Sequence, residues 1–72
     1  MEVILYKSAT CPQCRVAKMK LEKKGIPFTE VLDMDVITAR GVEGIPTLEV
    51  DGELIYPIGK INNWITAQED QA

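Results

Sequence analysis

The sequence predicts an α/β domain with the element order βαβαββα, and three observations support this. An apolar segment, a helical segment and a second strand-like segment follow one another at the start of the chain, which is typical of a βαβ unit with parallel strands. Two later strand-like segments are joined by Asp51 and Gly52, a two-residue signal for a β-hairpin. The final segment has apolar residues at helical spacing.

The first three elements surround a small polar loop. Val3–Tyr6 is apolar at every position, which indicates a central strand covered on both faces. Residues 7–10 form the loop. Pro12–Lys24 predicts a helix, because proline is favoured at the first helical position and Gly25 supplies a stop. Residues 28–32 alternate in polarity and predict a second strand, more exposed than the first.

The first helix has one predicted buried face and a second apolar edge. Cys14, Ala17 and Leu21 recur at spacings of three and four residues and are expected to face the core. Val16 and Met19 form the second apolar edge, next to that face.

The second half of the chain repeats this alternation with shorter elements. Residues 33–40 predict a short helix capped by an aspartate and ended by a glycine. Thr47–Val50 and residues 53–56 predict the two hairpin strands. The last helix is expected to bury one stripe made of Ile61, Trp64 and Ile65. Residues 68–72 are polar and expected to fray.

Composition limits the classes of function. The 72 residues suffice for one domain, 1–72, with 46% hydrophobic and 26% charged residues, an ordinary globular mix. A net charge of -3 without a long basic run argues against a nucleic-acid partner. The apolar runs are too short to span a bilayer, and no leader pattern stands at the N-terminus, so we expect a cytoplasmic protein. We also expect it to be a monomer. Histidine is absent, which removes the commonest general base and metal ligand.

The two cysteines, Cys11 and Cys14, are the candidate catalytic residues. They stand where a strand and a polar loop give way to a helix, and a CxxC pair near a βαβ pattern indicates redox chemistry. The thiolate is the reactive form of a cysteine, and a helix N-terminus stabilises negative charge. We therefore expect Cys11 to attack a substrate disulfide and Cys14, one turn later, to release the product.

Structural or binding roles for the two cysteines are weaker hypotheses that stay open. A structural disulfide across so short a loop would stabilise the chain by only about 2 kcal/mol. A zinc site needs about four ligands, so the pair could form only half of one, completed by carboxylates or a second chain. The cysteines could also be inert core thiols, or belong to a non-catalytic redox-sensing or adaptor module.

Two motifs make the chain resemble a glutaredoxin of the thioredoxin superfamily. The first is the Thr-Cys-Pro-Gln-Cys segment of residues 10–14, followed by the Gly-Ile-Pro-Phe segment of residues 25–28. The second is Gly-Ile-Pro-Thr at residues 44–47, which matches the loop that carries a cis-proline in that family. The resemblance covers nearly the whole chain. It implies a thioredoxin-like (glutaredoxin) fold, with a four-stranded mixed sheet flanked by helices on both faces.

The resemblance also implies the residues that surround the substrate. Pro46 is expected to be cis beside the cysteines, with the backbone of Ile45 pairing with an extended substrate chain. Pro12 and Gln13 lie between the cysteines. The remaining candidate substrate-binding residues are Lys7, Tyr56 and Gly59.

The sequence allows two roles for each of Lys7, Tyr56 and Arg40, and favours one role for Trp64. Lys7 could support the thiolate or be a solvated surface charge, and Tyr56 could flank the groove or pack at a strand end. Trp64 is expected to anchor the last helix in the core. Arg40 could bind a substrate carboxylate, since arginine forks suit carboxylates, or be a solvated charge at a helix end.

Two branches of the family remain open for function. A glutaredoxin takes its electrons from glutathione, which would be a co-substrate, with no bound cofactor, and reduces protein disulfides or glutathione mixed disulfides. An NrdH-type redoxin takes them from thioredoxin reductase and passes them to ribonucleotide reductase. Pro12 is the glutaredoxin choice, whereas Gln13 is frequent in NrdH-type proteins. A single glycine, Gly59, replaces the double glycine that many glutaredoxins have before the last helix.

Overall fold

The computed structural model describes residues 1–69 and confirms the predicted element order. Its elements are β1 (Val3–Tyr6), α1 (Pro12–Lys24), β2 (Thr29–Val31), α2 (Met34–Ala39), β3 (Thr47–Val50), β4 (Glu53–Ile55) and α3 (Ile58–Ala67). The sheet is mixed and has the strand order β2-β1-β3-β4. β1 runs parallel to β2 and antiparallel to β3, and β3 pairs with β4 as a hairpin.

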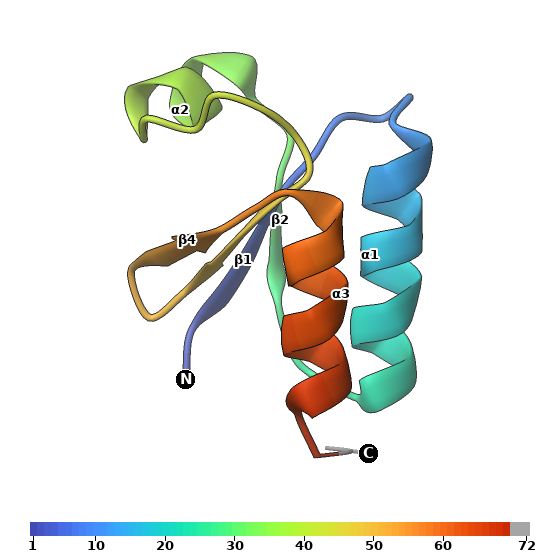
Figure 1. Cartoon of the computed structure of the whole chain (residues 1–72). Helices are drawn as coiled ribbons and strands as arrows, with labels where there is room; N and C mark the ends of the chain where they lie inside the picture. Colours follow the sequence, from blue (N-terminus) through green and yellow to red (C-terminus); the bar gives the residue numbers. More distant parts are fainter. Residues whose placement is uncertain (70–72) are drawn as a thin grey trace.

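The helices lie on both faces of the sheet, as the resemblance implied. α1 and α3 stand side by side against one face (Figure 1), and the short α2 packs through Ile37 against Tyr6 on the other face. β1 alternates between the two faces. Val3 and Leu5 join the core under α1 and α3, whereas Tyr6 packs with Ile37 of α2.

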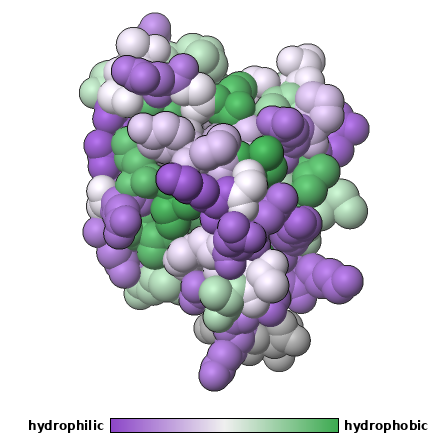
Figure 2. Space-filling view, viewed as in Figure 1, coloured by the Kyte–Doolittle hydropathy of each residue, from purple (hydrophilic) through white to green (hydrophobic). Residues whose placement is uncertain are grey.

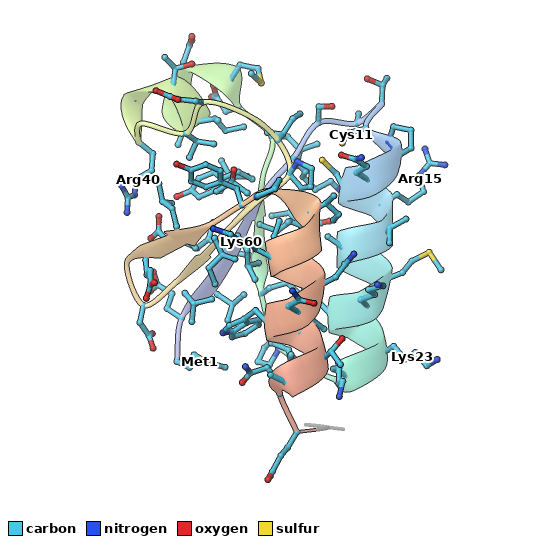
Figure 3. The ribbon with its side chains drawn as sticks, in the orientation of Figure 1. Met1, Cys11, Arg15, Lys23, Arg40 and Lys60 are labelled. Carbon is cyan, nitrogen blue, oxygen red and sulfur yellow. The ribbon has the colours of Figure 1, made fainter. Side chains whose placement is uncertain are left out.

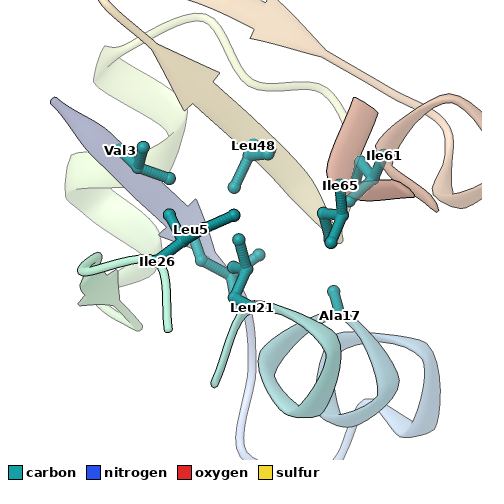
Figure 4. Close-up of a cluster of buried hydrophobic side chains, with 8 residues drawn as sticks. All are labelled: Val3, Leu5, Ala17, Leu21, Ile26, Leu48, Ile61 and Ile65. Atoms are coloured by element: carbon teal, nitrogen blue, oxygen red, sulfur yellow. The ribbon is translucent and has the colours of Figure 1, made fainter. Parts of the chain in front are cut away.

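The larger core holds the long helices on the sheet (Figure 4). Leu5, Leu21, Leu48 and Ile61 are all fully buried in it. Full burial of such a side chain stabilises the fold by about 1.5–3 kcal/mol. This core therefore sets where α1 stands relative to the sheet, and with it the position of the cysteines at the start of α1.

Local signals set the ends of the helices. Pro12 is the first residue of α1, as predicted, and Gly25 ends the helix with φ 71°, a left-handed conformation that suits glycine. Asp33 caps α2 by accepting hydrogen bonds from the backbone N–H groups of Asp35 and Val36. In the hairpin turn, Asp51 and Gly52 have φ of 49° and 91°, two positive values that a type I′ turn requires.

The structure corrects some expectations about surfaces and ends. Val16 and Met19, the second apolar edge of α1, lie at the surface, where they are 43% and 62% exposed. Gln68 is not frayed: its side chain donates to the carbonyl of Trp64, and its own carbonyl accepts from Lys24. Residues 70–72 of the predicted frayed tail lie outside the described residues. Trp64 is half-buried against the core.

Surface polarity differs between helices and hairpin. Hydrophilic side chains cover most of α1 and α3 on the face drawn in Figure 2, and hydrophobic ones gather over the β3–β4 hairpin.

In residues 1–69, no helix has the length and apolar character that crossing a membrane requires.

Candidate active site

Cys11 is the N-cap residue of α1, with extended backbone at φ -89° and ψ 111°. Its Sγ accepts a hydrogen bond from the backbone N–H of Cys14 at 3.1 Å. The sulfur therefore takes the place that a serine or aspartate oxygen usually fills at a helix start. Cys11 is partly exposed and Cys14 is buried, and both thiols are free. An exposed sulfur facing the positive end of a helix can carry negative charge and meet a substrate.

Cys14 lies one turn inside α1 and is held as a neutral thiol. Burial, followed by the hydrogen bond and the charge of Cys11, raises its pKa to about 11. A backbone hydrogen bond with Ser8 and the positive charge of Lys7 act in the opposite direction. The environments of the two sulfurs thus differ in the way the sequence predicted, one exposed at the helix end and one enclosed behind it.

The loop before β3 and the start of α3 form a small groove beside the motif. The groove, about 120 Å³, is lined by Gln13, Gly44, Ile45, Pro46, Tyr56, Pro57 and Ile58. The Ile45–Pro46 peptide bond is cis, as predicted, and so is Tyr56–Pro57, which the sequence did not lead us to expect. Among residues 1–69, no backbone hydrogen bond engages the N–H or C=O of Ile45. Tyr56 is 56% exposed and lines the groove rather than packing at a strand end.

A second and larger hollow adjoins Cys11 along the outer side of α1. This basic pocket, about 440 Å³, is lined by Lys7, Ser8, Ala9, Cys11, Arg15, Lys18, Met19 and Glu22. Its α1 residues recur at helical spacing, so they form one stripe that starts at Cys11. Arg15 points away from α3 into solvent (Figure 3).

One carboxylate of β2 forms ion pairs with two lysines of the basic pocket. Glu30 Oε1 lies 2.8 Å from Lys7 Nζ and 3.2 Å from Lys18 Nζ. These hydrogen bonds lower the pKa of the Glu30 carboxyl. Lys7 is therefore neither a freely solvated charge nor fully neutralised, because it shares a single anion with Lys18.

Two residues that the sequence singled out, Gly59 and Arg40, do not line the groove. Gly59 is an exposed residue of the first turn of α3 and does not line the groove. Arg40 neither reaches the cysteines nor stands free at a helix end (Figure 3). Its Nε donates to Glu49 Oε1 at 2.7 Å and its side chain also donates to the Gly52 carbonyl.

Tyr6 completes this network on the far face of the sheet. Its hydroxyl donates to the same Glu49 oxygen at 2.8 Å, and burial together with that hydrogen bond raises the pKa of Tyr6. Glu49 is only 8% exposed, in a strand where sequence reasoning assigned it no role. The network ties α2 to β1 and β3 and belongs to the fold rather than to the site.

Sequence reasoning missed the basic pocket. Helical periodicity alone places Arg15 and Lys18 towards solvent and Met19 on an apolar edge. The signal that could have found them is their spacing from the cysteine, since residues 11, 15, 18 and 22 lie on one helical stripe.

This arrangement can be compared with known proteins. The Glutaredoxin family model matches residues 3–55, from β1 through β4, and includes both cysteines and the cis-proline loop. This chain belongs to the glutaredoxin family. A curated relative is the glutaredoxin-like 8.6 kDa protein in the rubredoxin operon of Clostridium pasteurianum, 30% identical over 78% of this glutaredoxin and 84% of the relative.

Solved structures show the same thioredoxin-like fold. The trimeric glutathione transferase TDR1 of Leishmania superposes with a TM-score of 0.78 at 23% identity. That match covers all of this glutaredoxin, which spans only 18% of the TDR1 chain. Target protein XcR50 from X. campestris has a TM-score of 0.61 at 23% identity, with coverage of 92% and 97%. The likeness confirms the predicted fold, and the family indicates a thiol redox protein.

Proposed function

We propose that this glutaredoxin is an electron carrier that reduces disulfides through Cys11 and Cys14. The observation that carries the proposal is the bond from the Cys14 N–H to Cys11 Sγ at the start of α1. In the first step the Cys11 thiolate attacks a substrate disulfide, forming a mixed disulfide and releasing one substrate thiolate. In the second step Cys14, having lost its proton, attacks Cys11 Sγ and displaces the second thiolate. Two electrons pass to the substrate, and a Cys11–Cys14 disulfide remains.

The environment of Cys14 suits this order of events. Two of the causes that raise its pKa, the hydrogen bond and the charge of Cys11, depend on a free Cys11 sulfur. Both are removed once that sulfur is part of a mixed disulfide and carries no charge. The positive charge of Lys7 remains and favours the Cys14 thiolate. Cys14 therefore stays a thiol until a substrate is attached, and then becomes easier to ionise.

The groove is the proposed binding site for the polypeptide chain of the substrate. The backbone of Ile45 has an unused N–H and C=O, which an extended peptide could pair with in the manner of an added strand. Gln13 and Tyr56 also line the groove, and Pro12 is exposed at the helix start beside Cys11. Substrates would be protein disulfides or glutathione mixed disulfides in a cytoplasmic, reducing environment.

Glutathione is the first candidate reductant, on the strength of the family. A thioredoxin reductase is the second, in which case ribonucleotide reductase is a candidate target. The second is favoured by the lining of the groove, where Gln13 and the hydroxyl-bearing Tyr56 are the polar side chains and neither is charged at neutral pH. The charged γ-glutamyl end of glutathione needs polar partners, and Gly59 and Lys60 supply no acidic group there. The operon of the C. pasteurianum relative also supports an electron-transfer setting.

The test of the dithiol mechanism uses single cysteine variants. Cys11→Ser should abolish reduction of a protein disulfide. Cys14→Ser should stop after the first step and accumulate a mixed disulfide at Cys11, visible by mass spectrometry. Full activity in both variants would contradict the dithiol mechanism, whereas a wild type that reduces no disulfide would favour a non-catalytic adaptor.

The test of the reductant supplies electrons in two ways. NADPH is given either with glutathione and glutathione reductase or with thioredoxin reductase alone, and its oxidation is followed with one disulfide substrate. Faster turnover with glutathione supports the first candidate. Faster turnover with thioredoxin reductase supports the second.

A further inference from the structure

The charges of this glutaredoxin are divided unevenly between α1 and the rest of the chain. Five of the eight lysines and arginines lie on α1, together with one glutamate. Outside α1 the sequence has three basic and ten acidic residues. The chain is thus acidic overall but carries a basic helix, and Cys11 is the N-cap of that helix. Such a separation of charge orients a charged partner before contact.

The basic pocket brings this positive charge to the proposed nucleophile. It reaches from Cys11 along α1 to Glu22 and contains the cations of Lys7, Arg15 and Lys18. The Arg15 side chain makes no hydrogen bond or ion pair within residues 1–69, and the two lysines share Glu30 as their only anion. Positive charge therefore remains in the pocket, even with Glu22 at its far end.

Two hollows of different character adjoin the cysteine motif, because Cys11 lines the basic pocket and Gln13 lines the groove. The groove with Ile45 and Pro46 is small and mostly apolar, whereas the basic pocket is larger and cationic. A polypeptide bonded to Cys11 could occupy both at once, with an apolar side chain in the groove and an acidic one in the pocket. Met19, 62% exposed at the pocket wall, offers apolar contact to the stem of such an acidic side chain.

We propose that the basic pocket docks an acidic polypeptide segment next to the disulfide of the protein partner. The proposal rests on the function proposed above, because it takes Cys11 as the attacking sulfur. A polypeptide is favoured over a small anion because the positive charge continues along α1 beyond the pocket, through Lys20, Lys23 and Lys24. The charge of the partner would then set the speed of attack at Cys11.

The experiment compares three short peptides in which one cysteine is joined to 2-thiopyridine by a disulfide. The cysteine is flanked by glutamates, by glutamines or by lysines. Attack by Cys11 forms a bond to the peptide sulfur and releases thiopyridine, whose absorbance reports the rate. The Cys14→Ser variant is the background, so that a single exchange is measured.

The glutamate peptide should react fastest and the lysine peptide slowest, by about threefold for each charge at low salt, with smaller differences as salt is added. Arg15→Gln with Lys18→Gln should remove most of the preference. Lys20→Gln with Lys23→Gln is the matched control, since it removes the same charge from α1 outside the pocket. It should leave most of the preference at an ionic strength of about 0.1 M, where the screening length is about 10 Å.

Two outcomes would contradict the proposed docking surface and leave the proposed function unaffected. The first is an equal rate of reaction with all three peptides. The second is an equal loss of the preference for the glutamate peptide in the two double variants. A further probe is the thiopyridine disulfide of 3-mercaptopropionate, compared with that of its amide. The pocket serves a small anion instead if two results are obtained. The carboxylate probe must react faster than the amide probe by the same factor per charge as the peptides, and Arg15→Gln with Lys18→Gln must remove that difference. A Cys11 that reacts with none of the probes would contradict the proposed function itself.

Discussion

The backbone N–H of Cys14 points at Cys11 Sγ, 3.1 Å away, so the second cysteine of the motif helps to hold the first. The bond comes from the peptide group and survives any change of the Cys14 side chain. Cys14→Ser should therefore leave the geometry of Cys11 intact, which is why that variant is a suitable background for measuring the first exchange step alone.

Lys7 is expected to speed the second step, because its charge favours the Cys14 thiolate. Lys7→Gln should slow resolution of a mixed disulfide at Cys11 by about threefold or more. The mixed disulfide is formed at low pH, moved to neutral pH, and followed by acid quenching and mass spectrometry. Glu30→Gln should act in the opposite direction, since it removes the carboxylate that lies 2.8 Å from Lys7. Lys23→Gln, which loses the same charge at the far end of α1, is the control. A rate unchanged by Lys7→Gln would show that this lysine does not support Cys14.

The raised pKa of Cys14 predicts a loss of stability at alkaline pH. In the unfolded chain a cysteine titrates near pH ~8.5, whereas Cys14 in the fold titrates at about 11. Between these values the unfolded state releases a proton that the folded state retains, so the free energy of unfolding falls as pH rises. The contribution of the Cys14 thiol to the free energy of unfolding is fully present below pH ~8.5 and is lost as pH approaches 11.

Urea unfolding of the reduced protein across this range measures the effect. Wild type should lose more stability than Cys14→Ser, which keeps Cys11, Tyr6 and every lysine and so shares the other alkaline titrations. Parallel losses in the two proteins would mean that Cys14 titrates alike in both states.

The Tyr6–Glu49–Arg40 network should contribute to stability and not to catalysis. Arg40→Gln removes a hydrogen bond to a carboxylate that is 8% exposed, and should lower the free energy of unfolding by about 1–3 kcal/mol. The value of kcat/KM for a disulfide substrate should not change, since Arg40 lies far from Cys11 (Figure 3). Lys60→Gln, an exposed charge change on α3, is the control for both measurements. A fall in kcat/KM at unchanged stability would restore Arg40 as a substrate ligand.

Gly59 tests whether the first turn of α3 touches the substrate. A Cβ built there would meet no heavy atom within 4 Å, and the residue is helical. Gly59→Ala should therefore stabilise the protein by about 0.5–1 kcal/mol, because alanine loses less conformational entropy than glycine in a helix. Thermal unfolding and KM for the disulfide substrate are measured together. A raised KM in a stabilised variant would return Gly59 to the binding site, where the resemblance had placed it.

Short-range sequence patterns were sufficient to predict the helices and strands and to identify the cysteine motif. The residues that start and stop α1, the Asp-Gly turn and the apolar run of β1 all act within a few positions of one another, so each could be identified without tertiary structure. The placement of Cys11 at a helix start follows from Pro12 in the same way. The cis conformation at Pro46 was expected from resemblance alone, since the local sequence around a proline seldom requires it.

Local sequence signals are enough to place two cysteines one turn apart at the start of a helix in an α/β domain. The charges that surround these cysteines depend on how distant segments pack together. Glu30 reaches Lys7 across 23 positions and Glu49 reaches Tyr6 across 43, pairings that exist only once the sheet has brought β1 beside β2 and β3. The burial of Glu49, the exposure of Met19 and the pocket beside Cys11 follow from how α1 and α2 pack on that sheet, and no local pattern encodes such packing.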